Sequence, residues 1–209
     1  MKKEALRIGI TGGIGVGKTT VCRLFETLGI PVYYADTAAK NLLEHDPELR
    51  TSVIRLLGVD AYRDGHYNRA YVAQKVFGQP ELLQQLNQLV HPAVETHSRA
   101  WHETHQDAPY TLKEAALMIE SGSHRFLDAL IVVTAPETLR IERVMSRDRL
   151  TEAEVRARIA RQLPEQEKVA LADFVVENDG KHALIPQVWA IHQQLLGGHS
   201  AARRRTPTK

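Results

Sequence analysis

The sequence predicts an α/β fold in which a parallel sheet is covered by helices on both faces. Short apolar runs of strand type recur at residues 6–10, 32–35, 130–133 and 174–176, and helical patterns lie between them. A glycine-rich turn joins the first run to the first helical pattern. Strands that alternate with helices are typical of parallel sheets, because each connecting helix packs back onto a face of the sheet.

The first strand and the first helix have the clearest patterns. Residues 6–10 form a short apolar run of the buried-strand type. Apolar residues then recur at the i, i+3, i+4 and i+7 spacing of one helix face, namely Val21, Leu24, Phe25 and Leu28. Gly29 follows this face and Pro31 lies beyond it, so we expect the helix to end there.

The later elements are predicted in the same way. A further candidate strand lies within residues 110–119, where Lys113 and Glu114 interrupt it. Pro136 and Glu137 open a helix, and apolar residues mark a final helix near the C-terminus. Residues 49–105 are mostly helical in pattern and contain no convincing strand, while residues 146–170 are charged and rich in arginine.

These patterns predict one domain over residues 1–199. No linker rich in proline, glycine or serine divides it. The expected parts are a core (1–48, 106–145 and 171–199), a helical insertion (49–105), a lid (146–170) and a disordered basic tail (200–209).

Residues 12–19 read Gly-Gly-Ile-Gly-Val-Gly-Lys-Thr and match the phosphate-binding pattern G-x-x-x-x-G-K-[ST]. Its glycines let successive backbone N–H groups point at one anion, Lys18 reaches the β- and γ-phosphates, and the Thr19 hydroxyl binds Mg²⁺. A chance glycine turn is the alternative, but the flanking strand and helix favour a nucleoside triphosphate site. The predicted nucleotide-binding residues are Gly13, Ile14, Gly15, Val16, Gly17, Lys18, Thr19 and Thr20.

Composition limits the other classes of function. The formal net charge is +2, but the last ten residues hold four basic residues and no acid, so the rest of the chain carries −2. A basic tail of this kind is a poor argument for nucleic-acid binding. No apolar run approaches the about 20 residues that span a bilayer, so we expect no membrane segment. The single cysteine, Cys22, is expected to be a buried thiol, which favours the cytoplasm.

Asp36 closes the second apolar run. Ligands of open parallel sheets bind at the carboxyl ends of the strands, so we expect Asp36 to face the phosphate site. A carboxylate there accepts a proton from an attacking hydroxyl, or orients that hydroxyl toward the γ-phosphate. The alternative is an N-cap for the helix that begins with Thr37.

Arg143 and Arg147 are the candidate cations of the lid region. They lie four residues apart on one helix face, and neither has an acid three or four residues away. Such a like-charged pair is relieved by an anionic ligand, so we predict that Arg147 neutralises the transferred phosphoryl group, with Arg161 a weaker candidate. The alternative is two exposed arginines. His91 either contacts an acceptor or satisfies a helix end.

Taken together, these motifs resemble the dephospho-CoA kinase family along nearly the whole chain. The loop alone indicates only phosphate binding, whereas the ordered set of motifs is far more specific. The segments that carry the resemblance are residues 11–20, 28–32 with 35–36, 68–69 with 76–77, 89–92, 117–122, 143–148, 161–162 and 176–178.

The resemblance implies a three-layer P-loop kinase core with a parallel sheet, a helical acceptor-binding insertion and a helical lid. It implies ATP-dependent transfer of the γ-phosphate to the ribose 3′-hydroxyl of dephospho-CoA, the last step of coenzyme A synthesis, with Mg²⁺ as cofactor. It assigns catalysis to Asp36, Lys18 and Arg147. The ATP site gains Asn178, and the acceptor side gains Arg69, His91 and Glu120.

Two other functions stay open from the sequence. One is a kinase of the same type that acts on another small hydroxyl or nucleotide acceptor. The other is a nucleotide-binding switch, although the chain lacks the Asn-Lys-x-Asp guanine signature and a lid suits transfer with water excluded. The oligomeric state does not follow from the sequence.

Overall fold

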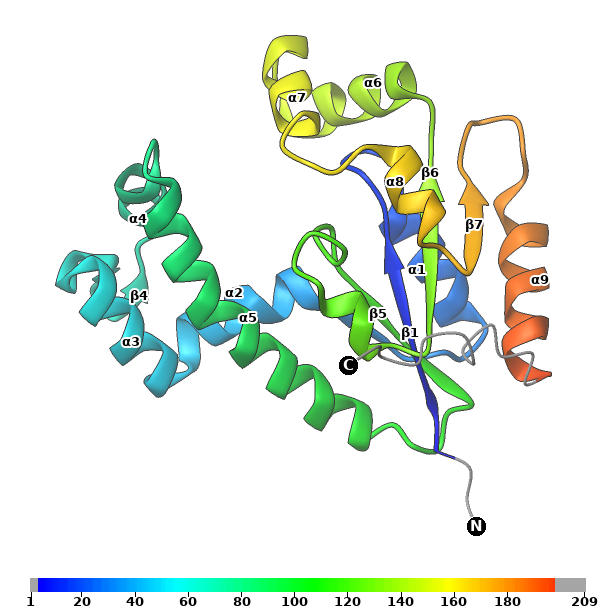
Figure 1. Ribbon diagram of the computed structural model, residues 1–209, viewed down its shortest axis with the longest axis horizontal. Coiled ribbons are helices and arrows are strands. Elements are labelled where there is room, and N and C mark those ends of the chain that lie inside the picture. The colour runs from blue at the N-terminus through cyan, green and yellow to red at the C-terminus, as the bar shows by residue number, and fades with distance from the viewer. Residues whose placement is uncertain (1–3, 198–209) are drawn as a thin grey trace. The chain divides into compact units, whose positions relative to one another are not determined.

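The computed structural model describes residues 4–197, which form two compact units (Figure 1). The core unit comprises residues 4–33 and 102–197, and the helical unit comprises residues 34–101. Residues 34–48, which the sequence analysis assigns to the core, are part of the helical unit because their helix packs on the helix that follows it. The predicted disordered tail lies outside the described residues.

Within the described residues, the core unit contains a five-stranded sheet with the strand order β2-β5-β1-β6-β7. β1 pairs in parallel with both β5 and β6, and β6 pairs in parallel with β7. The strand bounds are Leu6–Thr11 for β1, Val32–Tyr34 for β2, Tyr110–Glu114 for β5, Ala129–Thr134 for β6 and Phe174–Glu177 for β7. The predicted α/β class is confirmed.

Helices cover both faces of this sheet. α1 (Lys18–Thr27) and α9 (Leu184–Leu196) pack on each other and on the strands, whereas α8 (Glu165–Ala170) packs on β6 from the front in Figure 1. Leu130 and Val132 of β6 join a buried cluster with Met118. Since side chains alternate along a strand, the residues between them face the opposite layer.

The buried face of α1 is the face that the apolar spacing predicts. Val21, Cys22 and Phe25 are each fully buried, and Gly29 adopts a positive φ of 78° just beyond the helix end. Burial, with a smaller effect of Glu114, raises the pKa of the Cys22 thiol. The prediction of a buried thiol is confirmed.

β5 continues through the two charged residues that the sequence analysis treats as an interruption. Lys113 and Glu114 are only 8% and 7% exposed and pair in register with Gly9 and Ile10 of β1. That part of the prediction is wrong, because backbone pairing to a central strand outweighs the low strand propensity of these residues.

The remaining helices of the core unit follow β6. α6 and α7 pack on each other and share a buried cluster of Ile141, Val144 and Val155. Thr151 caps α7 reciprocally with Glu154, which fixes where that helix begins. The bounds are Glu137–Asp148 for α6 and Glu152–Ile159 for α7. A short 3-10 helix at Ser123–Phe126 precedes β6.

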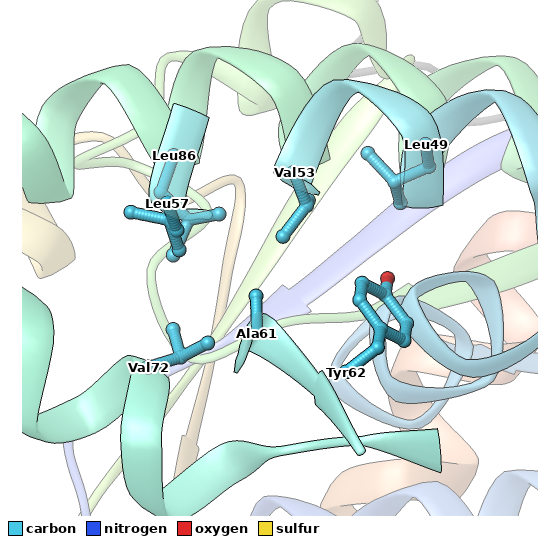
Figure 2. Packing of buried hydrophobic residues seen from close by; sticks show 7 residues of the cluster. All are labelled: Leu49, Val53, Leu57, Ala61, Tyr62, Val72 and Leu86. Atoms are coloured by element: carbon cyan, nitrogen blue, oxygen red, sulfur yellow. The ribbon is translucent and has the colours of Figure 1, made fainter. Parts of the chain in front are cut away.

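The helical unit packs around its own apolar core, whose central residues Figure 2 shows. Those residues are Leu49, Val53, Leu57, Ala61, Tyr62, Val72 and Leu86. The elements are α2 (Ala35–His45), α3 (Pro47–Leu57), a 3-10 turn (Val59–Ala61), β3 (Tyr62–Arg63), β4 (His66–Tyr67), α4 (Arg69–Val76) and α5 (Pro80–Glu103). In the described part of the chain, no helix is long and apolar enough to cross a membrane.

β3 and β4 form a small antiparallel hairpin inside the region expected to hold no strand. Asp64 and Gly65 make its turn, with φ angles of 50° and 86°. Asp-Gly favours this kind of two-residue turn, so the dipeptide was a signal that the sequence analysis did not use. The expectation that residues 49–105 contain no strand is therefore wrong, although most of the region is helical as expected.

Candidate active site

The glycine loop leaves the carboxyl end of β1 and leads directly into α1. Gly12 has a φ of 152°, and a Cβ atom there would lie 2.3 Å from the Val133 carbonyl oxygen of the neighbouring strand. Only glycine fits this close backbone approach. The strand, loop and helix that the motif requires are therefore all present.

The Lys18 ammonium lies inside the loop. Its Nζ atom donates to the carbonyl oxygens of Gly12 at 2.9 Å and of Gly13 at 3.3 Å. Thr19 and Thr20 are exposed in the first turn of α1, where the helix dipole favours an anion. The loop thus combines a positive charge, a helix N-terminus and exposed hydroxyl groups.

A buried arginine, which the sequence analysis did not identify, donates a hydrogen bond to the loop. Arg140 of α6 is 6% exposed, and its Nε atom donates to the Ile14 carbonyl oxygen at 2.9 Å. Its Nη1 atom lies 3.8 Å from Glu165 Oε2. A Cβ atom on Gly13 would come within 2.4 Å of the guanidinium, so the loop rests directly on this group.

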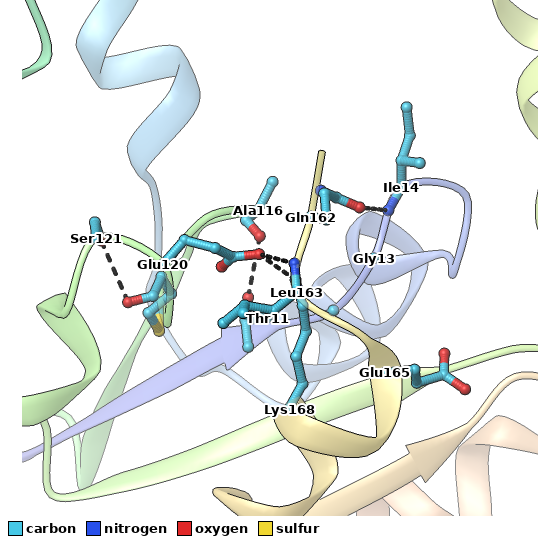
Figure 3. Close-up of polar contacts among 12 residues, drawn as sticks. Thr11, Gly13, Ile14, Ala116, Glu120, Ser121, Gln162, Leu163, Glu165 and Lys168 are labelled. Carbon is cyan, nitrogen blue, oxygen red and sulfur yellow. Dashed lines mark hydrogen bonds and ion pairs between the residues drawn. The ribbon is translucent and has the colours of Figure 1, made fainter. Parts of the chain in front are cut away.

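Gln162 also reaches the loop. Its Oε1 atom accepts a hydrogen bond from the Ile14 backbone N–H at 2.8 Å (Figure 3). Ile14 and Gln162 are 148 residues apart in the sequence, so no local pattern predicts this contact. The resemblance includes Gln162 among its motifs but gives it no role.

Asn178 lies directly after β7 and joins the loop to α6. Its Nδ2 atom donates to the Val16 carbonyl oxygen at 2.8 Å. Arg143 Nη2 donates to the backbone oxygen of Asn178 at 3.2 Å and to its side-chain oxygen at 3.3 Å. Two of the predicted ligand-binding positions, the loop and Asn178, are therefore in direct contact.

Arg147 has an acidic partner, which lies outside the three- and four-residue spacing of a helix face. Its Nε and Nη2 atoms donate to the two carboxylate oxygens of Asp148 at 2.7 and 3.0 Å. This bond lowers the pKa of the Asp148 carboxyl. The partner is the next residue in the sequence, not one three or four residues away. Arg147 is nevertheless 65% exposed at the side chain.

Glu120, predicted on the acceptor side, contacts the segment around α8 in this structure. Its Oε1 atom accepts from Lys168 Nζ at 2.7 Å and from the Leu163 backbone N–H at 3.1 Å (Figure 3). Burial acts to raise the pKa of this carboxyl, but the hydrogen bonds from Lys168 and the backbone together outweigh it and lower the pKa.

Asp36, Arg69 and His91 belong to the helical unit. Tyr34 is the N-cap of α2, so the alternative that Asp36 caps this helix is wrong; Asp36 is exposed in the first turn. His91 lies in the middle of α5, and both of its predicted roles stay predictions. Arg69 lines a cavity of about 410 Å³ within this unit, together with Lys40, Glu44 and Tyr67.

The parallel sheet, the glycine loop at a helix N-terminus and the lysine inside it define a P-loop kinase. A family description, "CoaE: Dephospho-CoA kinase", matches residues 6–183. The chain belongs to the dephospho-CoA kinase family.

Curated relatives of the same name cover most of the chain. A dephospho-CoA kinase of Bacteroides fragilis (strain YCH46) is 37% identical over 184 residues, 88% of this chain and 90% of that protein. One from Salinibacter ruber is 42% identical over 176 residues, 83% of this chain and 88% of that protein.

Solved structures agree with the fold. A Thermus thermophilus protein, TT1252, matches with a TM-score of 0.79 and 32% identity over 95% of this chain and all (100%) of that one. A dephospho-CoA kinase from Campylobacter jejuni matches with a TM-score of 0.68 over 92% of this chain and 98% of that one. At 24% identity the second likeness supports the fold alone.

Proposed function

We propose that the protein transfers the γ-phosphoryl group of ATP to the ribose 3′-hydroxyl of dephospho-CoA, giving CoA and ADP. The observation that carries the proposal is the loop between β1 and α1, with the Lys18 ammonium within hydrogen-bond distance of its carbonyl oxygens. Membership of the dephospho-CoA kinase family over residues 6–183 supports the choice of acceptor.

The loop binds the phosphates through its own backbone. The loop supplies backbone N–H groups other than that of Ile14, which donates to Gln162, and the N-terminus of α1 adds its dipole. Lys18 carries the positive charge toward the β- and γ-phosphates. Asn178 and Arg143 close the other side of the loop, where the family resemblance supports the adenine end of ATP.

Mg²⁺ fits this site through the exposed Thr19 hydroxyl. The ion takes one or two oxygen ligands from a protein and completes its shell with phosphate oxygens and water, so a single hydroxyl in the first turn of α1 is a suitable donor. When bound, Mg²⁺ neutralises charge on the β- and γ-phosphates.

Asp36 orients the acceptor hydroxyl and accepts its proton. The transition state of phosphoryl transfer is loose, so a carboxylate that orients the 3′-hydroxyl and takes up its proton is sufficient. Asp36 is exposed and lies in the first turn of α2, where a negative charge is favoured. The cavity beside Arg69 supports an acceptor site in the same unit.

Arg147 neutralises the transferred group by changing partner. Its guanidinium forms a two-bond pair with Asp148, a geometry that suits a phosphoryl group equally well. Because this side chain is mostly exposed, exchanging one anion for another costs little desolvation.

We further propose that the reaction takes place in the cytoplasm. The only cysteine of the sequence, Cys22, is a fully buried thiol rather than half of a disulfide. This usage is typical of proteins of reducing compartments.

A coupled assay with ATP, Mg²⁺ and dephospho-CoA tests the function. We expect turnover with dephospho-CoA above that with a panel of other hydroxyl and nucleotide acceptors. Faster turnover of another acceptor would make the protein a different small-molecule kinase. ATP hydrolysis without any acceptor, stimulated by a partner protein, would instead indicate a nucleotide-binding switch.

The variant Asp36→Asn tests the role of the carboxylate. We expect kcat to fall about 100-fold or more while ATP still binds, because a general base contributes on this scale. Asp60→Asn, an exposed aspartate of the same unit, is the matched control and should keep full activity. Normal turnover by Asp36→Asn would contradict the role.

A further inference from the structure

The peptide groups at Ile14 are held from two directions. Gln162 Oε1 accepts from the Ile14 N–H at 2.8 Å, and Arg140 Nε donates to the Ile14 carbonyl oxygen at 2.9 Å. Ile14 is the third residue of the phosphate-binding loop. Two side chains from outside the loop therefore fix the orientation of its backbone at this point.

Gln162 is itself held in place by its neighbour. Leu163 donates its backbone N–H to Glu120 Oε1 at 3.1 Å, and the same oxygen accepts from Lys168 Nζ at 2.7 Å. Figure 3 shows the Glu120 carboxylate on one side of the segment with Leu163 and Lys168, and the phosphate-binding loop on the other side. One carboxylate oxygen thus ties both ends of the segment 163–168 to the turn after β5.

The ion pair between Glu120 and Lys168 is buried, so forming it costs desolvation free energy. The Lys168 side chain is 1% exposed and that of Glu120 is 19% exposed. Glu120 Oε2 is buried and has no hydrogen-bond partner within residues 4–197. Ion pairs this deep often stabilise less than apolar side chains of the same size, although they can specify one arrangement of the chain.

We propose that Glu120 and Gln162 are positioning residues that preorganise the phosphate-binding loop, and that Glu120 acts as the anchor of segment 163–168 rather than as a ligand of the acceptor. Gln162 sets the direction of the Ile14 N–H, and Glu120 sets the position of Gln162. A loop already ordered in this way loses less conformational freedom when it binds the phosphates. The proposal rests on the proposed function only for the identity of the nucleotide.

The Gln162 contact is tested with two substitutions of similar size. Gln162→Met removes the acceptor oxygen but keeps the length of the side chain, whereas Gln162→Glu keeps an acceptor. We expect amide exchange of the Ile14 N–H, followed by NMR, to accelerate about tenfold in Gln162→Met, the effect of losing one hydrogen bond. Gln162→Glu should keep this amide protected.

Calorimetry with Mg²⁺·ATP gives the functional readout. The Kd of Gln162→Met should rise about threefold to tenfold, by the same argument. Gln166→Met, an exposed glutamine of α8, is the matched control and should change neither measurement. Unchanged Ile14 exchange and unchanged Kd in Gln162→Met would overturn the role of Gln162.

The anchor is tested with paired substitutions that leave no buried charge unpaired. Glu120→Gln with Lys168→Met keeps an oxygen for the Leu163 N–H, so Ile14 exchange should stay near that of the unmodified protein. Glu120→Ala with Lys168→Met removes that oxygen and should accelerate exchange at Ile14, although neither Ile14 nor Gln162 is altered. Only an anchor role predicts this difference at a distance.

The acceptor role of Glu120 gives the opposite result. If the KM for dephospho-CoA rises in both double variants while Ile14 exchange and the Kd of Mg²⁺·ATP stay constant, Glu120 is an acceptor ligand and the anchor proposal is wrong. The exchange and calorimetry experiments need no acceptor. Failure to turn over dephospho-CoA would therefore count against the proposed function alone.

Discussion

Asn178 Nδ2 donates to the Val16 carbonyl oxygen at 2.8 Å across a sequence separation of 162 residues. This bond joins the end of the last strand to the phosphate-binding loop near the start of the chain. Gly17, the residue after Val16, is the N-cap of α1 with a φ of 89°. A Cβ atom there would lie 2.2 Å from Asn178 Nδ2, so the Asn178 side chain leaves room only for glycine at position 17.

Gly17→Ala should weaken ATP binding and lower stability. Backbone strain at positive φ costs about 1–2 kcal/mol for a non-glycine residue, and the clash with Asn178 adds to it. We expect the Kd of Mg²⁺·ATP to rise about tenfold or more, corresponding to about 1.4 kcal/mol. Urea unfolding and calorimetry measure both effects.

Gly29→Ala is the matched control for this variant. Gly29 also has a positive φ, of 78°, but a Cβ atom there would meet nothing within 4 Å. It should therefore show the stability loss without the loss of affinity. Gly17→Ala should cost less affinity when it is introduced into Asn178→Ala than when it is introduced into the unmodified protein; an equal cost in both backgrounds would mean that the clash does not explain the defect.

Arg140→Met should cost more stability than the loss of an exposed arginine. The substitution removes the donor to the Ile14 carbonyl and the positive charge that faces Glu165, a loss of about 2 kcal/mol for a bond to a charged group. Arg156→Met is the control, since Arg156 is 52% exposed at the side chain and pairs with two exposed acids. Equal losses in urea unfolding would contradict the buried role of Arg140.

Arg147→Met should lower kcat by about 100-fold, the usual effect of removing one group that stabilises transition-state charge. Stability should change little, because the Arg147–Asp148 pair is largely exposed. Arg158 lies 3.6 Å from the same aspartate and is proposed for no catalytic role, so Arg158→Met should keep its kcat. Steady-state kinetics decide the prediction, which fails if both variants are equally active.

Stability should fall as the pH drops below about 6.5, the ordinary pKa of histidine. His192 is buried, and its Nδ1 atom forms a 2.7 Å hydrogen bond with Tyr110 Oη. Burial lowers the pKa of His192 and, mainly through burial as well, that of His102. The unfolded chain then binds protons that the folded chain does not, so acid favours unfolding.

Urea unfolding at pH 7.5 and pH 5.5 measures this dependence. His192→Gln removes one of the two groups and should reduce the difference between the two pH values. His45→Gln, an exposed histidine at the end of α2, should leave the difference unchanged. An identical difference in His192→Gln would rule out His192 as a source of the pH dependence.

The parts of the fold that local patterns encode were predictable. The strand at residues 6–10, the glycine loop and the α1 face of Val21 and Phe25 all depend on residues close in sequence. β5 was harder, because the buried Lys113 and Glu114 are strand residues only through their pairing with β1. Tertiary pairing overrides local propensity in such a strand.

The candidate site divides in the same way. The loop and Lys18 follow from a local motif, whereas Arg140 and Gln162 reach the loop from 126 and 148 residues away and carry no local signal. Arg147 shows the opposite limit. Its partner Asp148 is the adjacent residue, so the i±3 and i±4 spacing of a helix face does not reveal the pair. The roles of Asp36, Arg69 and His91 remain predictions.

The burial of Cys22 has a practical consequence for studying the enzyme. The chain has one cysteine, it is fully buried on the helix that follows the phosphate-binding loop, and burial raises its pKa. A thiol-reactive dye can therefore attack only while α1 is transiently detached from the sheet. The labelling rate reports how often the core opens, and its slowing by ATP would give the nucleotide affinity without an engineered probe.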